Sequence, residues 1–289
     1  MTKLSTTDLQ LKANDVRVDI INMLAEAKSG HSAGPLGMAD VFTALYFGVM
    51  NHEPKNPKWD GRDYLVLSCG HICPVLYGAL AEAGYFPKDE LKTLRKLNTR
   101  LQGHPHNIGT PGIETTSGPL SQGSSQAAGI AYGLLMDKKP NRVFLIASDG
   151  EQQEGQTWEA AMFAGKYKLR NLIAIMDRNN IQIDGGTEEV MPLEKLREKY
   201  ESFNWDVIEI NGHNFNEIIA AYERAKNSAE KPTMIIAHTV PGKGVGYMEN
   251  NYLWHGNPPG IADVAGAPPK AEQTAAALAD LAKARDAIK

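Results

Sequence analysis

The stretch RVFLIASDG at residues 142–150 and the stretch NLIAIMDRNN at residues 171–180 decide the fold of this chain. Each begins with an apolar run of the length of a buried strand, and the Ala-rich segment 154–168 between them has a helical pattern. Nearly continuous apolar strands that alternate with helices are typical of a parallel sheet covered on both faces. The two stretches therefore predict a three-layer α/β fold with a mostly parallel sheet.

The same alternation continues on both sides of this unit. Apolar runs and helical spacing predict three more strands and five more helices, the strands at residues 64–67, 205–210 and 233–238, and the helices at residues 9–28, 37–50, 74–83, 192–202 and 215–227. Residues 98–121 are rich in Gly, Pro, Thr and Ser, and so long a loop inside a compact domain is usually functional. We expect one domain over residues 1–258. Over residues 259–289 we expect a linker and a terminal helix that packs on the domain rather than docking on a partner.

The composition is that of an ordinary globular protein. The chain has 289 residues, and its 30 basic and 34 acidic residues give a net charge of −4, without the basic excess of a nucleic-acid-binding protein. No apolar run approaches the ~20 residues of a membrane helix, and the N-terminus lacks the apolar core of a signal peptide. The two cysteines, Cys69 and Cys73, make no disulfide framework and lack the usual spacing of a zinc-binding pair. We therefore expect a cytoplasmic protein that binds neither nucleic acid nor membranes.

Asp149 and Asn179 each follow one of the two apolar runs of the central unit. Because a right-handed βαβ unit brings the carboxyl ends of its strands to one edge of the sheet, we expect both residues where ligands bind in open α/β sheets. Carboxylate and amide oxygens suit Mg²⁺, and the irregular backbone after Asn179 can add the carbonyl oxygen of Ile181. Gly150 has no Cβ and lets a backbone N–H approach a phosphate closely. The segment thus predicts a site for Mg²⁺, or for Ca²⁺ or Mn²⁺, beside a phosphate group.

Four of the eight histidines stand in loops or at the ends of helices and strands, each beside Gly or Pro. They are His31 in KSGH, His71 in SCGH, His104 in QGHP and His255 in WHG. Imidazoles in such positions can donate and accept protons near neutral pH. Each alone is typical of a packed loop residue, but three stand beside elements that could line the same edge of the sheet, so the set indicates a functional site. His213 in NGHN is expected to shape a turn.

These segments resemble known patterns. Residues 148–186 resemble the thiamine diphosphate (ThDP) fingerprint, with Ser148 where its first Gly usually stands. The phrases KSGH, GPLGMAD, SCGH, QGHP, TTSGPLSQG, QEG and WHG resemble the transketolase family, and they cover most of the chain between Lys28 and Gly256. The α-subunit of a 2-oxo-acid dehydrogenase is an alternative, which shares the Asp/Asn pair but not the histidine phrases.

The resemblance to transketolases implies a role for each matching residue. It implies metal ligation by three oxygens, those of Asp149, Asn179 and the carbonyl of Ile181. It implies contacts with the diphosphate and the thiazolium of ThDP by His71, Gly118, Pro119, Leu120, Asp149, Gly150, Asn179, Ile183 and His255. It places His31, His104 and His255 at the reacting carbons, where they would donate hydrogen bonds to sugar hydroxyls and to the developing oxyanion.

Glu154 in the phrase QEG completes the expected catalytic set. It resembles the family's interface carboxylate, which communicates with the cofactor-activating Glu of the partner. Two residues depart from the family pattern. Pro241 stands where the family often has Lys, which leaves a phosphate contact to Lys243 or to no residue, and Cys69 replaces the usual Asn or Lys.

The implied activity is transfer of a two-carbon ketol unit from a ketose or its phosphate to an aldose or its phosphate. This chemistry also needs a domain that holds the aminopyrimidine and supplies the activating Glu, and no further strand–helix pattern follows residue 256. We therefore expect the N-terminal subunit of a split transketolase. It would act only with a C-terminal subunit carrying the pyrimidine-binding domain, in an α2β2 heterotetramer. Pentose phosphate metabolism and a specialised sugar pathway are both open. A non-catalytic interaction subunit is a further alternative, disfavoured by the retained metal pair and histidines.

Overall fold

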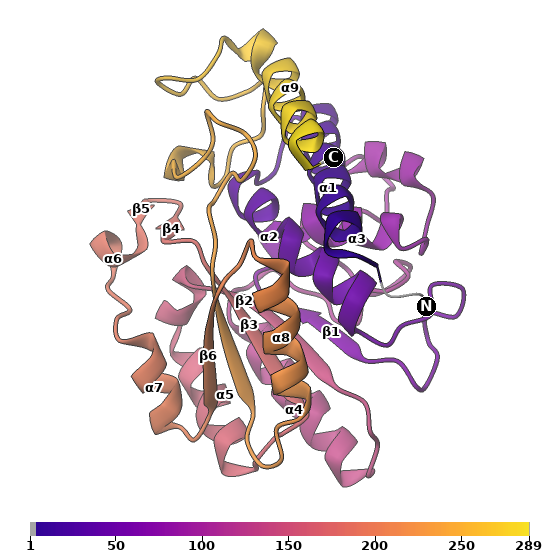
Figure 1. The fold of residues 1–289 in the computed structure, drawn as a ribbon, viewed down its shortest axis with the longest axis vertical. Helices are drawn as coiled ribbons and strands as arrows, with labels where there is room; N and C mark the ends of the chain where they lie inside the picture. The colour runs from indigo at the N-terminus through magenta and orange to yellow at the C-terminus, as the bar shows by residue number, and fades with distance from the viewer. Residues whose placement is uncertain (1–3, 289) are drawn as a thin grey trace.

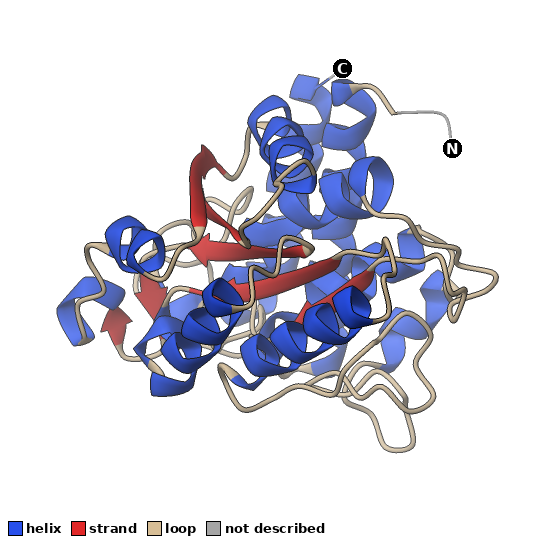
Figure 2. Cartoon of the chain, turned by 90° about the horizontal axis from the view of Figure 1, so that it is seen from below, coloured by secondary structure: helices blue, strands red, loops and turns tan. Residues whose placement is uncertain are grey.

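Five parallel strands form the main sheet of the molecule, in the order β1-β2-β3-β7-β6. In the computed structural model, which describes residues 4–288, the strands span Tyr64–Leu67 (β1), Val143–Ser148 (β2), Leu172–Arg178 (β3), Asp206–Asn211 (β6) and Thr233–His238 (β7). Helices cover both faces of the sheet, which is the middle of three layers (Figures 1 and 2). The predicted three-layer α/β fold with a parallel sheet is confirmed.

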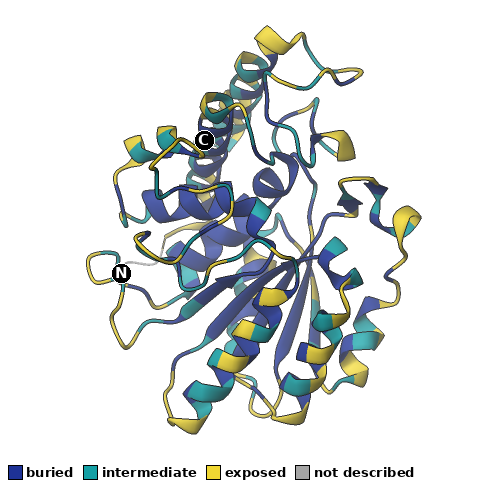
Figure 3. Cartoon of the chain, turned by 180° about the vertical axis from the view of Figure 1, so that it is seen from behind, coloured by how far each residue is buried: buried dark blue, intermediate teal, exposed yellow. Residues whose placement is uncertain are grey.

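Alternate residues of a strand face opposite layers of helices. Phe144 and Ile146 of β2 join the larger of two apolar cores, whereas Val143 and Leu145 join the smaller. The larger core includes residues of α1 (Thr6–Ala27), α2 (Ala33–Ala44), α3 (Cys73–Glu82) and α8 (Phe215–Lys226). The smaller includes residues of α4 (Gln122–Met136), α5 (Gly155–Lys166) and α7 (Leu196–Ser202). The central strands are therefore buried on both faces (Figure 3), which is why they are apolar up to Ala147 in β2 and Met176 in β3.

Several elements differ from the sequence-based expectations. Helix α4 was not predicted, and neither was the segment after β3 with the hairpin β4 (Ile181–Gln182) and β5 (Gly185–Gly186) and the short helix α6 (Thr187–Val190). The predicted helix over residues 37–50 ends as a π-helix, and the one over residues 192–202 begins only at Leu196. The π-helix and four 3₁₀ turns complete the described elements: η1 (Leu45–Val49), η2 (Gly70–Ile72), η3 (Lys88–Thr93), η4 (Gly150–Gln153) and η5 (Tyr252–Trp254).

The C-terminal helix α9 (Lys270–Ile288) packs along α1 (Figure 1). Ala277 and Leu281 are buried, and Arg285 forms an ion pair with Asp15 of α1. The buried side chain of Gln273 holds the preceding linker through three hydrogen bonds with its backbone. The helix is therefore fixed to the domain, whereas the boundary between domain and linker stays a prediction. Among the described residues, no helix is long and apolar enough to cross a membrane.

Candidate functional site

The candidate site lies at the carboxyl edge of the main sheet, where four neighbouring strands end. Strand β1 leads into the η2 turn with His71, β2 leads into Asp149, and β3 leads into Asn179. Strand β7 leads into the loop that ends at His255, directly after η5. Because these strands are parallel and adjacent, the four residues lie along one edge.

Three imidazoles from distant segments form a cluster at this edge. His31 lies between α1 and α2, and its ring centroid is 4.9 Å from that of His71 and 5.5 Å from that of His255. The rings of His71 and His255 are 5.1 Å apart. His104 is close enough to lower the pKa values of His31 and His71, and a Cβ on Gly118 would lie 3.8 Å from its Cβ. The structure therefore gathers three of the four histidines that the sequence singled out and places His104 against the loop segment at Gly118.

Burial keeps the cluster uncharged at neutral pH. Burial, with a smaller effect of the neighbouring His255, lowers the pKa of His31 to about 3. Burial also lowers the pKa of His255 to about 4 and holds the pKa of His71 well below its usual value. The Nδ1 atoms of His31 and His255 and the hydroxyl of Ser117 are buried without a hydrogen-bond partner. Since such atoms are uncommon in folded proteins, the cluster fits a polar ligand that supplies the missing partners.

Asp149 is buried at the end of β2 and accepts hydrogen bonds from four donors. Its Oδ1 accepts the N–H of Gly150 at 2.7 Å, and its Oδ2 accepts the N–H of Asn180 at 2.8 Å and Arg178 Nη1 at 3.0 Å. The hydroxyl of Thr187 lies 3.3 Å from the same Oδ2. Burial raises the pKa of Asp149, and the charge of Arg178 opposes this rise. Arg178 was not predicted from the sequence, although a charged residue directly after an apolar run was a signal for it.

Asn179 is oriented by its own loop. Its Oδ1 accepts the N–H of Ile181 at 3.0 Å, and its Nδ2 donates to Asp177 at 2.8 Å. Burial raises the pKa of Asp177 to about 7. Within residues 4–288, no group of three or more His, Cys, Asp or Glu residues is placed to hold a metal ion. A cation here would therefore need the oxygens of Asp149, Asn179, the backbone and a phosphate, and such hard oxygens fit Mg²⁺.

The loop before α4 lies against the η2 turn. A Cβ on Gly70 would be 2.7 Å from the Oγ of Ser117 and 3.0 Å from the N of Gly118, so glycine lets the two backbones approach. Pro119 is exposed, whereas Leu120 packs against the larger core. The segment 118–120, expected to contact the cofactor, is therefore fixed beside the turn that carries His71.

Ile183 and Glu154 occupy exposed positions. Ile183 lies between β4 and β5 and is 62% exposed. A Cβ on Gly256 would lie 3.6 Å from its Cδ1 and 3.8 Å from the Nε2 of His31, so the tip of the hairpin borders the histidine cluster. Glu154 directly precedes α5 and is exposed, and the structure does not bring it to the histidines.

His213 does more than shape a turn. Its Nε2 accepts the N–H of Val240 at 2.8 Å, so its Nδ1 donates to Asp40 of α2, also at 2.8 Å. The same carboxylate pairs with Arg17 of α1. The buried ion pair and the half-buried imidazole therefore tie two helices of the larger core to the loop that leads from β7 to the site.

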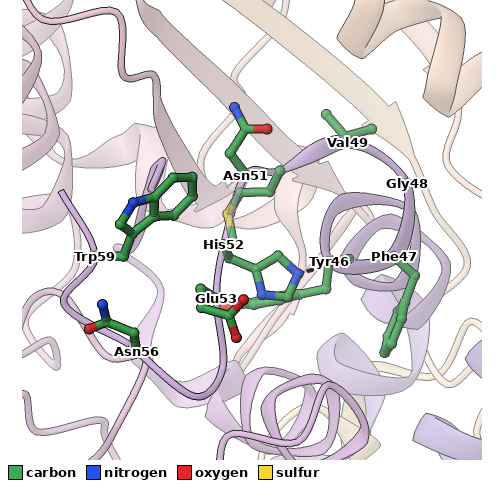
Figure 4. A pocket seen from close by; sticks show the side chains of 10 residues that line it. Tyr46, Phe47, Gly48, Val49, Asn51, His52, Glu53, Asn56 and Trp59 are labelled. Atoms are coloured by element: carbon green, nitrogen blue, oxygen red, sulfur yellow. Dashed lines mark hydrogen bonds between the residues drawn. The ribbon is translucent and has the colours of Figure 1, made fainter. Parts of the chain in front are cut away.

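A separate hollow of about 560 Å³ is lined by η1 and the loop that follows it (Figure 4). The N–H of Asn51 donates to Asp63, the residue before β1, so the hollow lies at the amino end of that strand. Both ring nitrogens of His52 form hydrogen bonds, Nε2 with the carbonyl of Tyr46 at 2.7 Å and Nδ1 with the hydroxyl of Tyr85 at 3.1 Å. The hollow is therefore not part of the site at the carboxyl edge.

Comparison with known sequences places this arrangement in a family. A family profile described as "Transketolase, thiamine diphosphate binding domain" matches residues 9–272. The chain is 46% identical over 248 residues to a 6-deoxy-6-sulfo-D-fructose transketolase subunit of Clostridium sp. (strain MSTE9), across 86% of this chain and 90% of that protein. It is 42% identical over 247 residues to an apulose-4-phosphate transketolase subunit of Phocaeicola vulgatus, across 86% of this chain and 88% of that protein.

Solved structures agree with this assignment. The transketolase of Campylobacter jejuni superposes with a TM-score of 0.83 at 33% identity, over 98% of this chain and 48% of that one. The transketolase of Leishmania mexicana gives a TM-score of 0.83 at 30% identity, over 97% of this chain and 46% of that one. The chain thus spans about half the length of these enzymes.

The fold and the site together define a thiamine diphosphate-binding α/β domain. The chain belongs to the transketolase family of enzymes. These findings confirm the family predicted from the sequence, and they do not fit the 2-oxo-acid dehydrogenase alternative.

Proposed function

We propose that this chain is the N-terminal subunit of a transketolase that transfers a two-carbon ketol unit from a ketose or its phosphate to an aldose or its phosphate. The observation that carries the proposal is the cluster of half-buried, uncharged histidines at the edge of the sheet that also carries Asp149 and Asn179, in a chain of the transketolase family. The names of two relatives, which are transketolase subunits, also support it. We place the activity in the cytoplasm.

The cofactor would lie at the carboxyl edge of the sheet. Asp149, Asn179 and the carbonyl of Ile181 would hold Mg²⁺, Ca²⁺ or Mn²⁺, which in turn would hold the diphosphate. Gly150 would present its backbone N–H to that group, and further contacts would come from His71, Gly118, Pro119, Leu120, Ile183 and His255. The chemistry that bound ThDP supplies is stabilisation of the carbanion left when the C–C bond of the ketose breaks.

His31, His104 and His255 would bind and orient the sugar. A neutral imidazole has one N–H donor and one acceptor nitrogen, so each ring can donate to a hydroxyl or to a developing oxyanion. Because the pKa values of His31 and His255 are lowered to about 3 and about 4, both rings stay neutral at pH 7 and no charge has to be neutralised before the sugar enters.

A C-terminal transketolase subunit would supply the pyrimidine-binding domain and its activating Glu. The rim of the site carries exposed apolar side chains that such a subunit would cover, among them Ile183, Val190, Met191, Tyr252 and Leu253. The exposed position of Glu154 suits a carboxylate that acts across the interface. We propose an α2β2 heterotetramer, with a cofactor at each interface between the two kinds of subunit.

The proposal is tested by reconstitution. The partner is identified by co-purification from the native source, and ketol transfer is assayed with ThDP and Mg²⁺ for the chain alone and for the complex. We expect activity only in the complex, and loss of that activity on the change Asp149→Ala. Robust activity of the chain alone would exclude the split enzyme, and full activity of the Asp149→Ala complex would exclude the proposed site.

A further inference from the structure

Glu151 is a completely buried carboxylate to which neither the resemblance nor the proposed function gives a role. It lies in the η4 turn, two residues after Asp149, and its side chain has no exposed surface. A carboxylate without hydrogen-bond donors is very unfavourable in such a position, so its surroundings have to supply them. They do so from three separate segments of the chain.

The three donors belong to three serine residues, one through its hydroxyl and two through their backbone N–H groups. The Oε1 of Glu151 accepts the hydroxyl of Ser68 and the backbone N–H of Ser121. Its Oε2 accepts the backbone N–H of Ser148 at 3.1 Å. Hydrogen bonds to a buried carboxylate are among the stronger ones in proteins, so Glu151 holds the three segments in a fixed relation.

Each of these segments leads directly to residues of the proposed cofactor site. Ser68 follows β1 and precedes the η2 turn with His71 by two residues, and Ser148 is the last residue of β2, adjacent to Asp149. Ser121 follows the segment 118–120 and precedes α4. One side chain thus connects three of the loops that would hold the cofactor.

The hydrogen bond from the N–H of Ser121 to Glu151 is important for the segment at Ser121, because its backbone has an unusual conformation. Ser121 is fully buried and has a φ of 68°, in the left-handed region that residues other than glycine rarely adopt. Its hydroxyl lies 2.7 Å from that of Thr157, which in turn donates to the backbone carbonyl of Glu151 at 3.2 Å. The first turn of α4 also packs closely against the residue that follows β1, since a Cβ on Gly123 would lie 2.5 Å from the Cβ of Ser68.

From these contacts we infer that Glu151 is a positioning residue, which fixes three of the cofactor-holding loops relative to one another without touching the reacting atoms. The inference rests on the proposed function, because it assumes that ThDP binds at this edge. Glutamine in its place has one acceptor oxygen and one donor NH₂ group, so at least one of the three serine donors would face another donor.

The test measures the affinity of the assembled two-subunit complex for ThDP at saturating Mg²⁺, by titration calorimetry, together with kcat at saturating ThDP. Loss of a hydrogen-bond partner that orients metal ligands weakens metal binding or activity by about 10–100-fold, and the diphosphate of ThDP would bind through such a metal. We therefore expect Glu151→Gln to raise the Kd for ThDP by about that factor while kcat falls much less. The matched control is Glu230→Gln, the same exchange at an exposed surface ion pair, which should leave the Kd unchanged.

Ser68→Ala removes a single donor and should raise the Kd in the same direction by a smaller factor. If Glu151→Gln does not fold, the Kd of the Ser68→Ala complex tests the positioning role of Glu151 in its place. Unchanged Kd values, even with a lowered melting temperature, would overturn the positioning role and leave Glu151 a purely structural residue. Asp149→Ala separates the two hypotheses: if it abolishes ThDP binding while Glu151→Gln does not alter it, only this inference fails. If neither change alters ThDP binding, the proposed function fails with it.

Discussion

Replacement of His255 by Asn should reduce the pH dependence of the stability of this chain below pH 7. In the folded chain, burial lowers the pKa of this imidazole to about 4, against about 6.5 in an unfolded chain. The unfolded state therefore binds more protons than the native state between these two values, and acid favours unfolding. The stability that the neutral ring contributes is fully present above pH 6.5 and is lost as the pH falls toward 4.

The size of the effect follows from proton linkage. Between pH 7.5 and pH 5.5 the native ring stays neutral, whereas the unfolded ring goes from nearly neutral to nearly fully protonated. The average difference over these two pH units is about half a proton, which corresponds to a loss of about 1.4 kcal/mol in the free energy of unfolding. The value does not depend on where below pH 5 the native pKa lies, so it is insensitive to the depth of burial.

The assay is urea unfolding of the cofactor-free chain, followed by tryptophan fluorescence at pH 7.5, 6.5 and 5.5. The difference in unfolding free energy between the unchanged chain and His255→Asn should change by about 1.4 kcal/mol across this range. The other titrating groups contribute the same pH dependence to both proteins, so their contributions cancel in this difference. Leu253→Ala, which alters the same turn without removing an imidazole, is the control and should give a constant difference. A constant difference for His255→Asn would refute the conclusion that this ring is held neutral.

Three further changes test the structure around the site. Arg178→Gln leaves the buried Asp149 without its counter-charge and should destabilise the chain by about 3–5 kcal/mol in urea unfolding at pH 7.5. Because protonation of the carboxyl relieves this loss, the destabilisation should shrink at pH 5.5, and an equal loss at both pH values would contradict the explanation. Asp40→Asn leaves Arg17 buried without its partner and should also lower the unfolding free energy at pH 7.5 by about 3–5 kcal/mol. A loss below about 1 kcal/mol would show that Arg17 and Asp40 do not form a buried ion pair. Leu281→Ala should reduce the melting temperature through a loss of about 2–5 kcal/mol, and no change would mean that α9 does not pack on α1.

The strands could be predicted because a strand that is buried on both faces consists of consecutive apolar residues, which are visible in the sequence. Residues 64–67 and 233–238 were located to the residue in this way. Helix α4 was missed because it begins QGSSQAAG, a run of small and polar residues that follows a loop of similar composition. The β4–β5 hairpin has two residues in each strand, which is too short for any periodicity to appear.

The placement of the site followed from topology, since residues after parallel strands meet at one edge. Its electrostatics could not be derived in the same way. The pairing of Arg178 with Asp149, the bond from His213 to Asp40 and the burial of Glu151 depend on how segments far apart in the chain approach each other. Sequence spacing fixes neither these distances nor the burial that shifts the pKa values.

The histidine cluster is where the demands of folding and of function oppose each other. The Nδ1 atoms of His31 and His255 are buried without a partner, and an unsatisfied buried polar atom costs about 1–3 kcal/mol. Apolar side chains would pack in these positions without that cost and without the loss of stability in acid. A ligand that binds only the native state and supplies the missing hydrogen bonds would offset it, by about 2.7 kcal/mol at a concentration of 100 times its Kd. A binding site contains polar groups that lower the stability of the cofactor-free chain and gain hydrogen bonds when the ligand binds. The unpaired imidazoles have this property, so they support the proposed site independently of the family resemblance.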